Sequence, residues 1–383
     1  MLPESRADGE HGMRPCAGPC TGAPAVVSSR MSAAAESDDA RWMRLALEQG
    51  RQGVGRTRPN PPVGAVVVAD GERIGQGWHR RAGEPHAEIE ALRDATARHP
   101  QRLRGATIYV TLEPCSTHGR TGPCTEALIA AGLSRVVWGA RDPNPQHAGR
   151  AETLLRAAGL AVTTGVLEAE CNALIQPFAK WITTGLPWVI AKAATSLDGR
   201  LTRPAGEGPW LTCEAARAHG RALRRRVDAI LVGAETVRQD DPQLTVRDAA
   251  DEDRPQPWRV VLSRSGQLPA EARLFTDAHR ERTLVLPGPD LHTALRDLGA
   301  RGISAVLIEG GGSVLGQAFE QQLVDEVHWY LAPRLCGAGT VPALGDAPWA
   351  ASVALTDVRF EPLGDNLCLT ARPVWPATAE DAP

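Results

Sequence analysis

The sequence predicts a two-domain protein of the α/β class, and three observations lead to this prediction. The chain has 383 residues, more than one average domain needs. Hydrophobic residues make up 43% and charged residues 23%, an ordinary balance for a globular protein whose halves each bury a core. Short apolar runs alternate with stretches of helical period, which is typical of a largely parallel sheet covered by helices.

The first half forms one such alternating unit. A helix is predicted over 38–50, where acidic residues precede an apolar face, and a hairpin over 63–79 around the turn Asp70-Gly71. The further elements are helices over 86–99, 124–132, 149–158 and 168–184, and strands over 106–112, 135–140 and 160–165. Gly185 and Pro187 then mark a domain boundary.

The second half has the same mixed texture. Its predicted strands cover 188–194, 227–233, 259–263, 282–286, 303–308, 326–332 and 353–371, and its predicted helices 212–225, 290–300 and 312–322. The last strands follow one another without helices, so part of this sheet should be antiparallel. The expected domains are therefore 38–184 and 186–375, with a frayed end from 376 onward.

Composition narrows the class of protein. Residues 1–37 are rich in Ala, Gly, Pro and Ser and are expected to be a disordered tail, in which Cys16 and Cys20 have no role. Met31 resembles a natural start, so residues 1–30 should be dispensable. The net charge of −3 gives no basic footprint for nucleic acid, and no apolar run approaches the length of a membrane span. Eight mostly isolated cysteines without an evident signal peptide favour a reducing cytoplasm.

The stretch PCSTHGRTGPC (114–124) carries the first functional signal. Cys115 and Cys124 each follow a proline, which predicts that each begins a helix, where free N–H groups favour the thiolate. A catalytic zinc needs three protein ligands and an open position. His86, at the start of the preceding helix after Pro85, is the predicted third ligand of one zinc ion per chain.

Glu88 is the predicted catalytic residue. It lies two positions after His86, and both side chains can face one point only at an irregular first helical turn. A carboxylate that does not bind the metal can move protons, and H-x-E followed by P-C is the signature of zinc deaminases. Here the second cysteine is nine positions on rather than three. The alternative of a structural zinc site would need a fourth ligand, for which His118 is the candidate.

Longer motifs in this half resemble a known family. The segments RPNPPVGAVVV (58–68), GWHRRAGEPHAE (77–88), VTLEPCSTHGRTGPC (110–124) and ARDPNPQHAGR (140–150) are similar to the deaminase domain of the bifunctional riboflavin-biosynthesis deaminase/reductases. The resemblance implies a cytidine-deaminase-like three-layer domain, with Asn60, His79, His118 and Arg120 lining the substrate pocket. Thr117 and Gly122 depart from the family's frequent His and Pro.

The second half resembles the reductase domain of the same family. The carrying segments are KAATSLDGRLT (192–202), GPWLT (208–212), VGAETVRQDDPQLTVR (232–247) and LIEGGGSVLGQAF (307–319), whose glycine turn alone would be weak evidence of phosphate binding. The resemblance implies a dihydrofolate-reductase-like fold that uses NADPH. Cofactor contacts then fall on Ala194, Trp210, Thr236, Asp240, Ser263, Gly311, Gly312, Ser313, Val314, Leu315, Gly316 and Gln317. Substrate contacts fall on Gly208, Arg224, Leu244, Arg247 and Glu309.

Two of these positions depart from the family pattern. Ala194 stands where the family usually has Gly, and Gly208 stands where it usually has Ser, so a hydroxyl contact is missing there. The charged residues suit their expected task, because the forked guanidinium groups of Arg224 and Arg247 match a sugar phosphate. Glu309 could accept hydrogen bonds from sugar hydroxyls.

By this resemblance the expected function is zinc-dependent hydrolytic deamination of 2,5-diamino-6-(5-phosphoribosylamino)pyrimidin-4-one, followed by NADPH-dependent reduction of its ribosyl chain to ribityl. The partner is thus a small pyrimidine sugar phosphate, and homo-oligomerisation is left open. A nucleic-acid-editing deaminase is disfavoured by the acidic balance and the lack of basic and aromatic residues in alternation. A non-catalytic zinc protein is disfavoured by Glu88 and by the NADP-type motifs.

Overall fold

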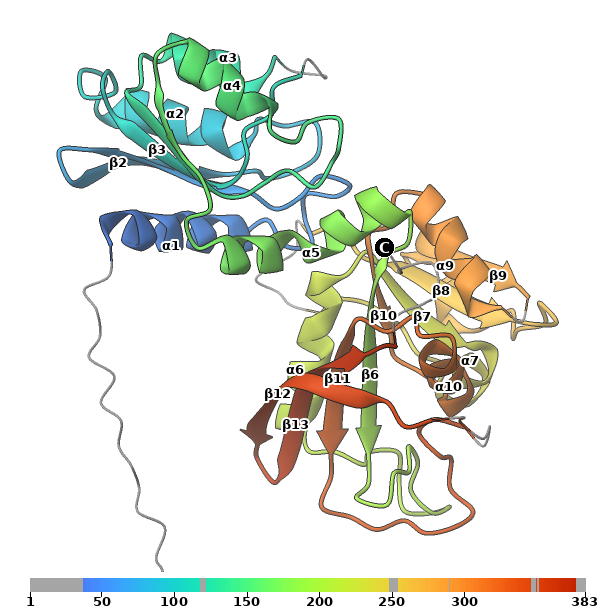
Figure 1. Cartoon of the computed structure of the whole chain (residues 1–383). Helices are drawn as coiled ribbons and strands as arrows, with labels where there is room; N and C mark the ends of the chain where they lie inside the picture. The colour runs from blue at the N-terminus through green and yellow to red at the C-terminus, as the bar shows by residue number, and fades with distance from the viewer. Residues whose placement is uncertain are drawn as a thin grey trace, which may run out of the picture. The chain divides into compact units, whose positions relative to one another are not determined.

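The computed structural model describes residues 37–117, 122–247, 254–288, 290–345, 349 and 351–376. Residues 1–36 of the tail expected over 1–37, the pocket candidates His118 and Arg120, and residues 377–383 of the expected frayed end lie outside the described residues. The described residues form two sheets, each with cores of its own (Figure 1). No helix within them is long and apolar enough to cross a membrane.

The first sheet has five strands in the order β2-β1-β3-β4-β5. The hairpin strands pair antiparallel with each other and β1 pairs antiparallel with β3, whereas β3, β4 and β5 run parallel. The strands are β1 Gly64–Ala69, β2 Glu72–Trp78, β3 Thr107–Leu112, β4 Arg135–Ala140 and β5 Ala161–Thr163. The helices are α1 Asp38–Arg51, α2 Ala87–Arg98, α3 Cys124–Ala130, α4 Arg150–Ala157 and α5 Glu168–Thr184.

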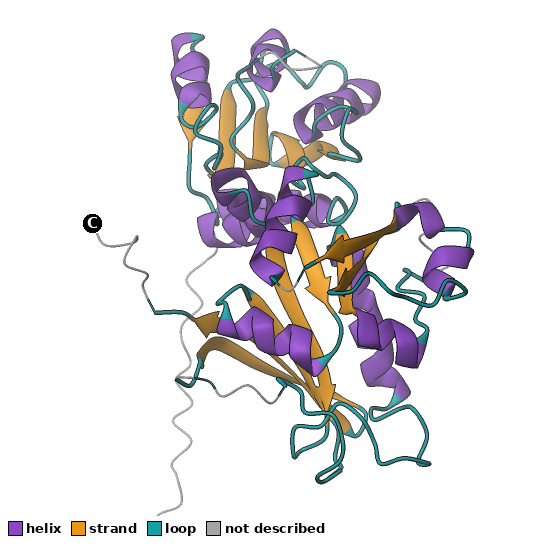
Figure 2. Ribbon diagram, turned by 90° about the vertical axis from the view of Figure 1, so that its right-hand side faces the viewer, coloured by secondary structure: helices purple, strands orange, loops and turns teal. Residues whose placement is uncertain are grey.

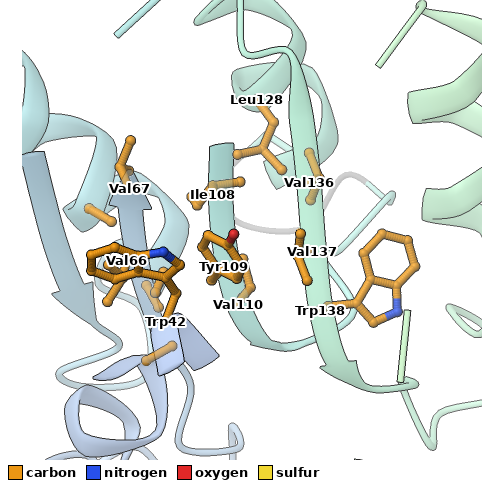
Figure 3. Close-up of a cluster of buried hydrophobic side chains, with 14 of the residues drawn as sticks. Trp42, Val66, Val67, Ile108, Tyr109, Val110, Leu128, Val136, Val137 and Trp138 are labelled. Carbon is orange, nitrogen blue, oxygen red and sulfur yellow. The ribbon is translucent and has the colours of Figure 1, made fainter. Parts of the chain in front are cut away.

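Helices cover both faces of this sheet, which confirms the expected three-layer architecture. In Figure 1, α1 and α5 lie on one face and α2, α3 and α4 on the other. Because both faces are covered, consecutive residues of a central strand are all buried, as for Ile108, Tyr109 and Val110 at 0%, 4% and 0% exposure (Figure 3). Trp42 of α1 contributes to the same core.

The second sheet has eight strands in the order β12-β13-β11-β6-β10-β7-β8-β9. The six strands from β11 to β9 are parallel, and the hairpin β12–β13 adds antiparallel at one edge, as expected. The strands are β6 Trp188–Thr195, β7 Ala229–Gly233, β8 Trp258–Ser263, β9 Thr283–Pro287, β10 Ala305–Ile308, β11 Glu326–Leu331, β12 Ala354–Leu363 and β13 Asn366–Val374.

Helices flank this sheet as well (Figure 2). They are α6 Glu214–Ala222, α7 Ala234–Asp240, α8 Arg273–Thr276, α9 Leu291–Ala300 and α10 Gly312–Glu320, with short 3₁₀ turns η1 Leu223–Arg226 and η3 Arg280–Arg282. Residues of α9 and α10 pack with one set of strand residues, and residues of η1, α7 and α8 pack with the alternate set. The two cores therefore lie on opposite faces of the sheet.

Two predicted elements differ from the structure, and the helices α7 and α8 were not predicted. The single strand expected over 353–371 is the hairpin β12–β13, which turns at Gly364 with φ +66°. The helix expected over 212–225 ends at Ala222 and continues as η1. The unpredicted helices α7 and α8 have seven and four residues, too few to establish a helical period. The other predicted elements are confirmed with small shifts at their ends.

Candidate functional site

Three side chains of metal-ligating type meet where the loop after β3 lies beside the N-terminal ends of α2 and α3. His86 caps the N-terminus of α2 with extended dihedral angles, φ −72° and ψ 165°, so its side chain is free of the helical repeat. Its Nδ1 lies 3.5 Å from Cys115 Sγ and 3.3 Å from Cys124 Sγ, and all three ligand atoms lie within 4.8 Å of one another. The predicted ligand set is thus brought together.

The expected helix start at Cys115 is wrong, whereas that at Cys124 is confirmed. Cys124 is the first residue of α3, with Pro123 at the N-cap, but residues 113–117 form an irregular loop after β3. A proline fits an extended segment as well as a helix start, so Pro114 could not tell the two apart. Instead the Cys124 N–H donates to Cys115 Sγ at 3.3 Å. The N-terminus of α3 therefore lies at both sulfurs, because the helix begins with Cys124 and the Cys124 N–H donates to Cys115 Sγ.

The three side chains of this cluster differ in how their pKa values are shifted. Contacts with Cys124 and His86 lower the pKa of Cys115 to about 4, and the contact with Cys115 raises the pKa of His86 to about 9. The pKa of Cys124 is raised by the same Cys115 contact and by burial. Cys115 is therefore the side chain of the cluster that most readily forms a thiolate. In a tetrahedral zinc site with ordinary bond lengths the ligand atoms stand roughly 3.5 Å apart, so the donor set and its spacing fit zinc.

Glu88 is buried at 3% exposure, near the start of α2. Burial raises the pKa of its carboxyl, which the positive field of His86 opposes, and a contact with Cys124 also acts on it. The carboxyl thus lies beside the cluster. It is nevertheless not one of the three side chains that converge on the metal position. This arrangement leaves Glu88 available for proton transfer.

Asn60 and His79 lie next to the same cluster. The His79 ring packs edge-on against the His86 ring with a centroid distance of 5.2 Å. Its Nδ1 lies 3.0 Å from the Pro85 carbonyl oxygen and its Nε2 lies 3.0 Å from Asn60 Nδ2. If Nδ1 donates to the carbonyl, Nε2 accepts from the Asn60 amide, and burial favours this neutral imidazole by lowering the pKa of His79.

The sequence analysis missed Glu113, which precedes the Pro114-Cys115 pair. Its carboxylate is buried and accepts the backbone N–H groups of Asp142, Gly149 and Ala151 at 3.3, 3.0 and 3.3 Å. The segment ARDPNPQHAGR therefore wraps around this carboxylate and supports the cysteine loop. The available signal was an acidic residue directly after a buried apolar strand, which needs a partner.

The second group of predicted residues gathers at the carboxyl ends of the parallel strands. Ala194 lies at the end of β6, Ser263 ends β8, and Thr236 and Asp240 belong to the helix after β7. The glycine turn follows β10. Since parallel strands present their carboxyl ends at one edge, these residues share one side of the sheet, where α/β proteins bind ligands.

The glycine turn has the properties of a ligand cradle. Gly311 caps α10 with φ +70°, and a Cβ on Gly310 would lie 3.0 Å from Thr236 Oγ1, so the turn and α7 lie close together. Gln317 Oε1 is buried and has no hydrogen-bond partner among the described residues. The N–H groups at the start of α10 fit the phosphates of a cofactor such as NADPH, and the unpaired Gln317 amide oxygen fits a hydrogen-bond donor such as a ribose hydroxyl.

Four residues of this turn are constrained by packing. The Val314 and Leu315 side chains are in the core, at 6% and 1% exposure, so only their backbone could face a cofactor. A Cβ on Gly312 would lie 2.1 Å from the Pro342 oxygen, and one on Gly316 would lie 2.4 Å from the Leu344 oxygen. These two glycines are thus required by the neighbouring segment, whatever they do for a ligand.

The predicted substrate residues Arg224 and Glu309 pair with each other. Arg224 Nε and Nη2 donate to the two Glu309 carboxylate oxygens at 2.6 and 2.9 Å, and Nη1 donates to the Thr245 carbonyl at 3.0 Å. The forked contact expected for a sugar phosphate is thus made to Glu309. Leu244, with φ +50°, has its side chain in the core, and burial lowers the pKa of the neighbouring Arg247.

The remaining two predicted residues lie in the loop between β6 and α6. Trp210 is 63% exposed, and the Arg217 guanidinium stands 5.0 Å from its ring centroid. Gly208 has φ +86°, a conformation that strains other residues. The absence of the family's Ser at this position therefore has a local conformational reason.

Lys192 is a further charged residue that the sequence analysis did not single out. It lies in the middle of β6, on the strand face that also carries Ala194, and its amine stands 5.9 Å from the Tyr330 ring centroid. Burial lowers its pKa, while the field of Glu309 opposes this shift. A lysine inside an otherwise apolar strand was the signal that could have found it.

Comparison with known proteins decides between the expectations for this pair of sites. Residues 36–140 match the model of the cytidine and deoxycytidylate deaminase zinc-binding region, and residues 187–369 match the RibD C-terminal domain. The chain is 39% identical to the riboflavin biosynthesis protein RibD of Escherichia coli, over 86% of this chain and 98% of that protein.

The chain belongs to the RibD family. RibD of Aquifex aeolicus is 36% identical, over 86% of this chain and 97% of the relative. Among solved structures, Acinetobacter baumannii RibD superposes with a TM-score of 0.80 at 37% identity, covering 88% of this chain and 99% of that one. The Thermotoga maritima diaminohydroxyphosphoribosylaminopyrimidine deaminase/5-amino-6-(5-phosphoribosylamino)uracil reductase gives 0.78 at 34% identity, with the same coverage.

Proposed function

We propose that this RibD family member deaminates 2,5-diamino-6-(5-phosphoribosylamino)pyrimidin-4-one and then reduces the ribosyl chain of the product, which gives 5-amino-6-(5-phosphoribitylamino)uracil. The chain is a bifunctional riboflavin biosynthesis enzyme that uses zinc and NADPH. We assign deamination to residues 38–184 and reduction to residues 186–375. The observation that carries the first assignment is the convergence of His86, Cys115 and Cys124 beside the buried carboxyl of Glu88.

In the deaminase half, His86, Cys115 and Cys124 would hold one zinc ion. Bound there, zinc supplies a Lewis acid that lowers the pKa of a water molecule. Glu88 takes a proton from the attacking water and delivers it to the departing amino nitrogen, so that ammonia leaves; the second water proton passes to the adjacent ring nitrogen as the carbonyl forms.

Asn60 and His79 would position the pyrimidine. The Asn60 amide nitrogen is occupied by His79 Nε2, which leaves its carbonyl oxygen to accept an N–H group of the ring. His79 is held in turn by the Pro85 carbonyl, one residue before the ligand His86. The substrate contact and the metal ligand are thus built on one short segment. The free thiol ligands suit a reducing compartment, and we place the reaction in the cytoplasm.

In the reductase half, the glycine turn would hold the phosphates of NADPH with its backbone N–H groups, and the Gln317 amide oxygen would accept a hydroxyl group of the cofactor. When bound, NADPH supplies the hydride for the ribosyl C1. The other proposed cofactor contacts are Ala194, Trp210, Thr236, Asp240 and Ser263. The substrate side is formed by Gly208, Arg224, Leu244, Arg247 and Glu309, and we add Lys192, whose buried amine faces the same charged pair.

Product analysis tests this function directly. The purified full chain is incubated with the diamino-pyrimidinone phosphate, with and without NADPH, and the products are identified by mass. Without NADPH we expect the deaminated, unreduced product to accumulate, and with NADPH the ribityl product. Deamination without any reduction, in protein that binds NADPH, would contradict the proposed second activity.

A further inference from the structure

A turn after β6 carries an aspartate to which no role has been assigned. Residues Ser196 to Arg200 close a tight turn, in which the Ser196 N–H donates to the Arg200 carbonyl at 3.0 Å and Gly199 has φ +74°. Asp198 lies at its tip and is exposed. The turn belongs to the carboxyl edge of the second sheet, the edge at which the proposed cofactor residues gather.

The Asp198 carboxylate binds a segment more than 130 positions away in sequence. Its Oδ1 accepts the Ser196 hydroxyl at 2.5 Å and the Cys336 N–H at 3.0 Å, and its Oδ2 accepts the Gly337 N–H at 2.6 Å. These donors hold the pKa of Asp198 well below its ordinary value. The carboxylate is therefore ionised at neutral pH, and its hydrogen bonds are charge-assisted.

Backbone hydrogen bonds extend this connection along residues 332–345, which we call the clamped segment. The Leu197 N–H donates to the Arg334 carbonyl and the Leu201 N–H to the Val341 carbonyl, both at 2.8 Å. The Val341 N–H donates to Thr202 Oγ1 at 3.0 Å. The clamped segment is thus bound to the turn near both of its ends, and Asp198 supplies the only carboxylate among these contacts.

The other side of the clamped segment rests on the proposed cofactor turn. Its Pro342 and Leu344 carbonyls come so close to α10 that a Cβ on Gly312 or Gly316 would collide with them. Gly312 is the first residue of α10, directly after the Gly311 cap. A displacement of the clamped segment would therefore remove the packing contacts of the Pro342 and Leu344 carbonyls that hold the start of α10 in place.

We propose that Asp198 is a positioning residue of the reductase, which holds the clamped segment against α10 and so keeps the glycine turn in its NADPH-binding form. The inference rests on the proposed function, because it assumes that NADPH occupies this turn. In this proposal Asp198 acts through its contacts with Cys336 and Gly337 rather than by binding the cofactor or substrate. Its effect on NADPH passes through backbone contacts of residues 336–345, which are fixed at one end by the carboxylate and at the other by the glycines.

The test compares Asp198→Asn and Asp198→Ala with Asp297→Asn, a matched control on α9 whose exposed side chain makes no hydrogen bond or ion pair with the described residues. NADPH affinity is measured by nicotinamide fluorescence with the full-length, zinc-loaded chain. Contacts of this indirect kind alter binding by about 0.5–2 kcal/mol, so we expect the NADPH Kd to rise roughly 2- to 30-fold in both Asp198 variants. Deamination should be unchanged, which shows that the deaminase half is folded.

Two further readouts separate positioning from a general loss of stability. Trypsin should cut after the exposed Arg334 faster in Asp198→Asn, because the release of the carboxylate frees this segment. Thr202→Val removes one weaker hydrogen bond to the clamped segment and should raise the NADPH Kd in the same direction, by less. Asp198→Glu, which keeps the charge, should recover part of the affinity.

The outcomes distinguish this inference from the function on which it rests. If the wild-type chain does not bind NADPH, the proposed reductase function fails. If wild type binds NADPH and both Asp198 variants bind it equally well, the positioning role is refuted while the function stands. Faster cleavage at Arg334 with unchanged NADPH affinity would likewise refute the link between the clamped segment and the glycine turn.

Discussion

Replacement of Arg224 by methionine should strongly destabilise the reductase half. Arg224 and Glu309 are each only 10% exposed, and Arg224 gives its donors to Glu309 and to the Thr245 carbonyl. Arg224→Met leaves the Glu309 carboxylate buried with Lys192 as the remaining nearby cation. Loss of one partner of a buried ion pair costs about 3–5 kcal/mol. Because Lys192 offsets part of this charge, we expect the lower end of that range.

The expected change in melting temperature follows from the domain size. For a domain of roughly 190 residues, 1 kcal/mol shifts Tm by about 2–4 °C, so Arg224→Met should lower the Tm of the reductase transition by roughly 6–12 °C. Calorimetry of the full chain measures it. The double variant Arg224→Met/Glu309→Gln no longer leaves the Glu309 carboxylate charged and unpaired, so it should recover part of the loss; recovery is incomplete because the buried Lys192 amine then lacks the carboxylate that supports its charge.

Arg221→Met serves as the matched control, because Arg221 and its partner Glu214 form an ion pair on the exposed face of α6. Exposed pairs contribute at most about 1 kcal/mol. The reasoning is refuted if Arg224→Met shifts Tm no more than this control does. It is equally refuted if the double variant is as unstable as the sum of the two single variants.

Three further predictions concern the metal site, the cysteine loop and acid stability. Cys115→Ser or Cys124→Ser should abolish binding of one zinc per chain, and metal analysis that finds full zinc in both would contradict the ligand set. Glu113→Gln should cost about 1–3 kcal/mol of stability by mismatching three backbone N–H donors, and should slow deamination but not reduction; equal Tm values for variant and wild type would exclude this. Burial raises the pKa of Glu326, but opposing contacts, of which the hydrogen bond with His328 is the largest, lower the net pKa to about 2. The stabilisation of the fold by the ionised Glu326 is therefore complete above the ordinary pKa of 4.5 and is lost as pH falls toward 2. Denaturation at pH 6 and pH 3 should therefore show a smaller acid loss in Glu326→Gln than in wild type, and an equal loss would show that the group is uninvolved.

The sequence was sufficient for elements whose residues repeat with one clear period. The helix at α5 and the strands β3 and β4 were predicted nearly to the residue, because their apolar patterns reflect cores that cover both strand faces. The hairpin β12–β13 was not separated, because β12 is exposed along nearly its whole length among the described residues and therefore has no buried set of side chains. The period of apolar residues reflects which side chains are buried, so it cannot show where a strand without buried side chains begins or ends.

The functional residues likewise fall into those that the sequence predicted and those that it did not. The ligands were predictable because zinc restricts both the residue types and their number, so that two cysteines and H-x-E sufficed. The pairing of Arg224 with Glu309 was not, because residues 85 positions apart carry no pattern that shows which charge each one meets. Glu113 and Asp198 were missed for a related reason. Both act on backbone N–H groups of distant loops, and a backbone donor leaves no mark in a sequence.

The separation of the two chemistries at Glu88 tests the central claim most directly. Glu88→Gln keeps nearly the same shape but cannot carry a proton, and a positioned acid or base contributes roughly 100- to 10,000-fold to a rate. In folded, zinc-loaded protein we expect deamination to fall by at least about 100-fold, while reduction of the already deaminated substrate with NADPH proceeds at the wild-type rate. Deamination near the wild-type rate would contradict the role of Glu88. Loss of reduction in the same protein would contradict the assignment of the two reactions to separate sites.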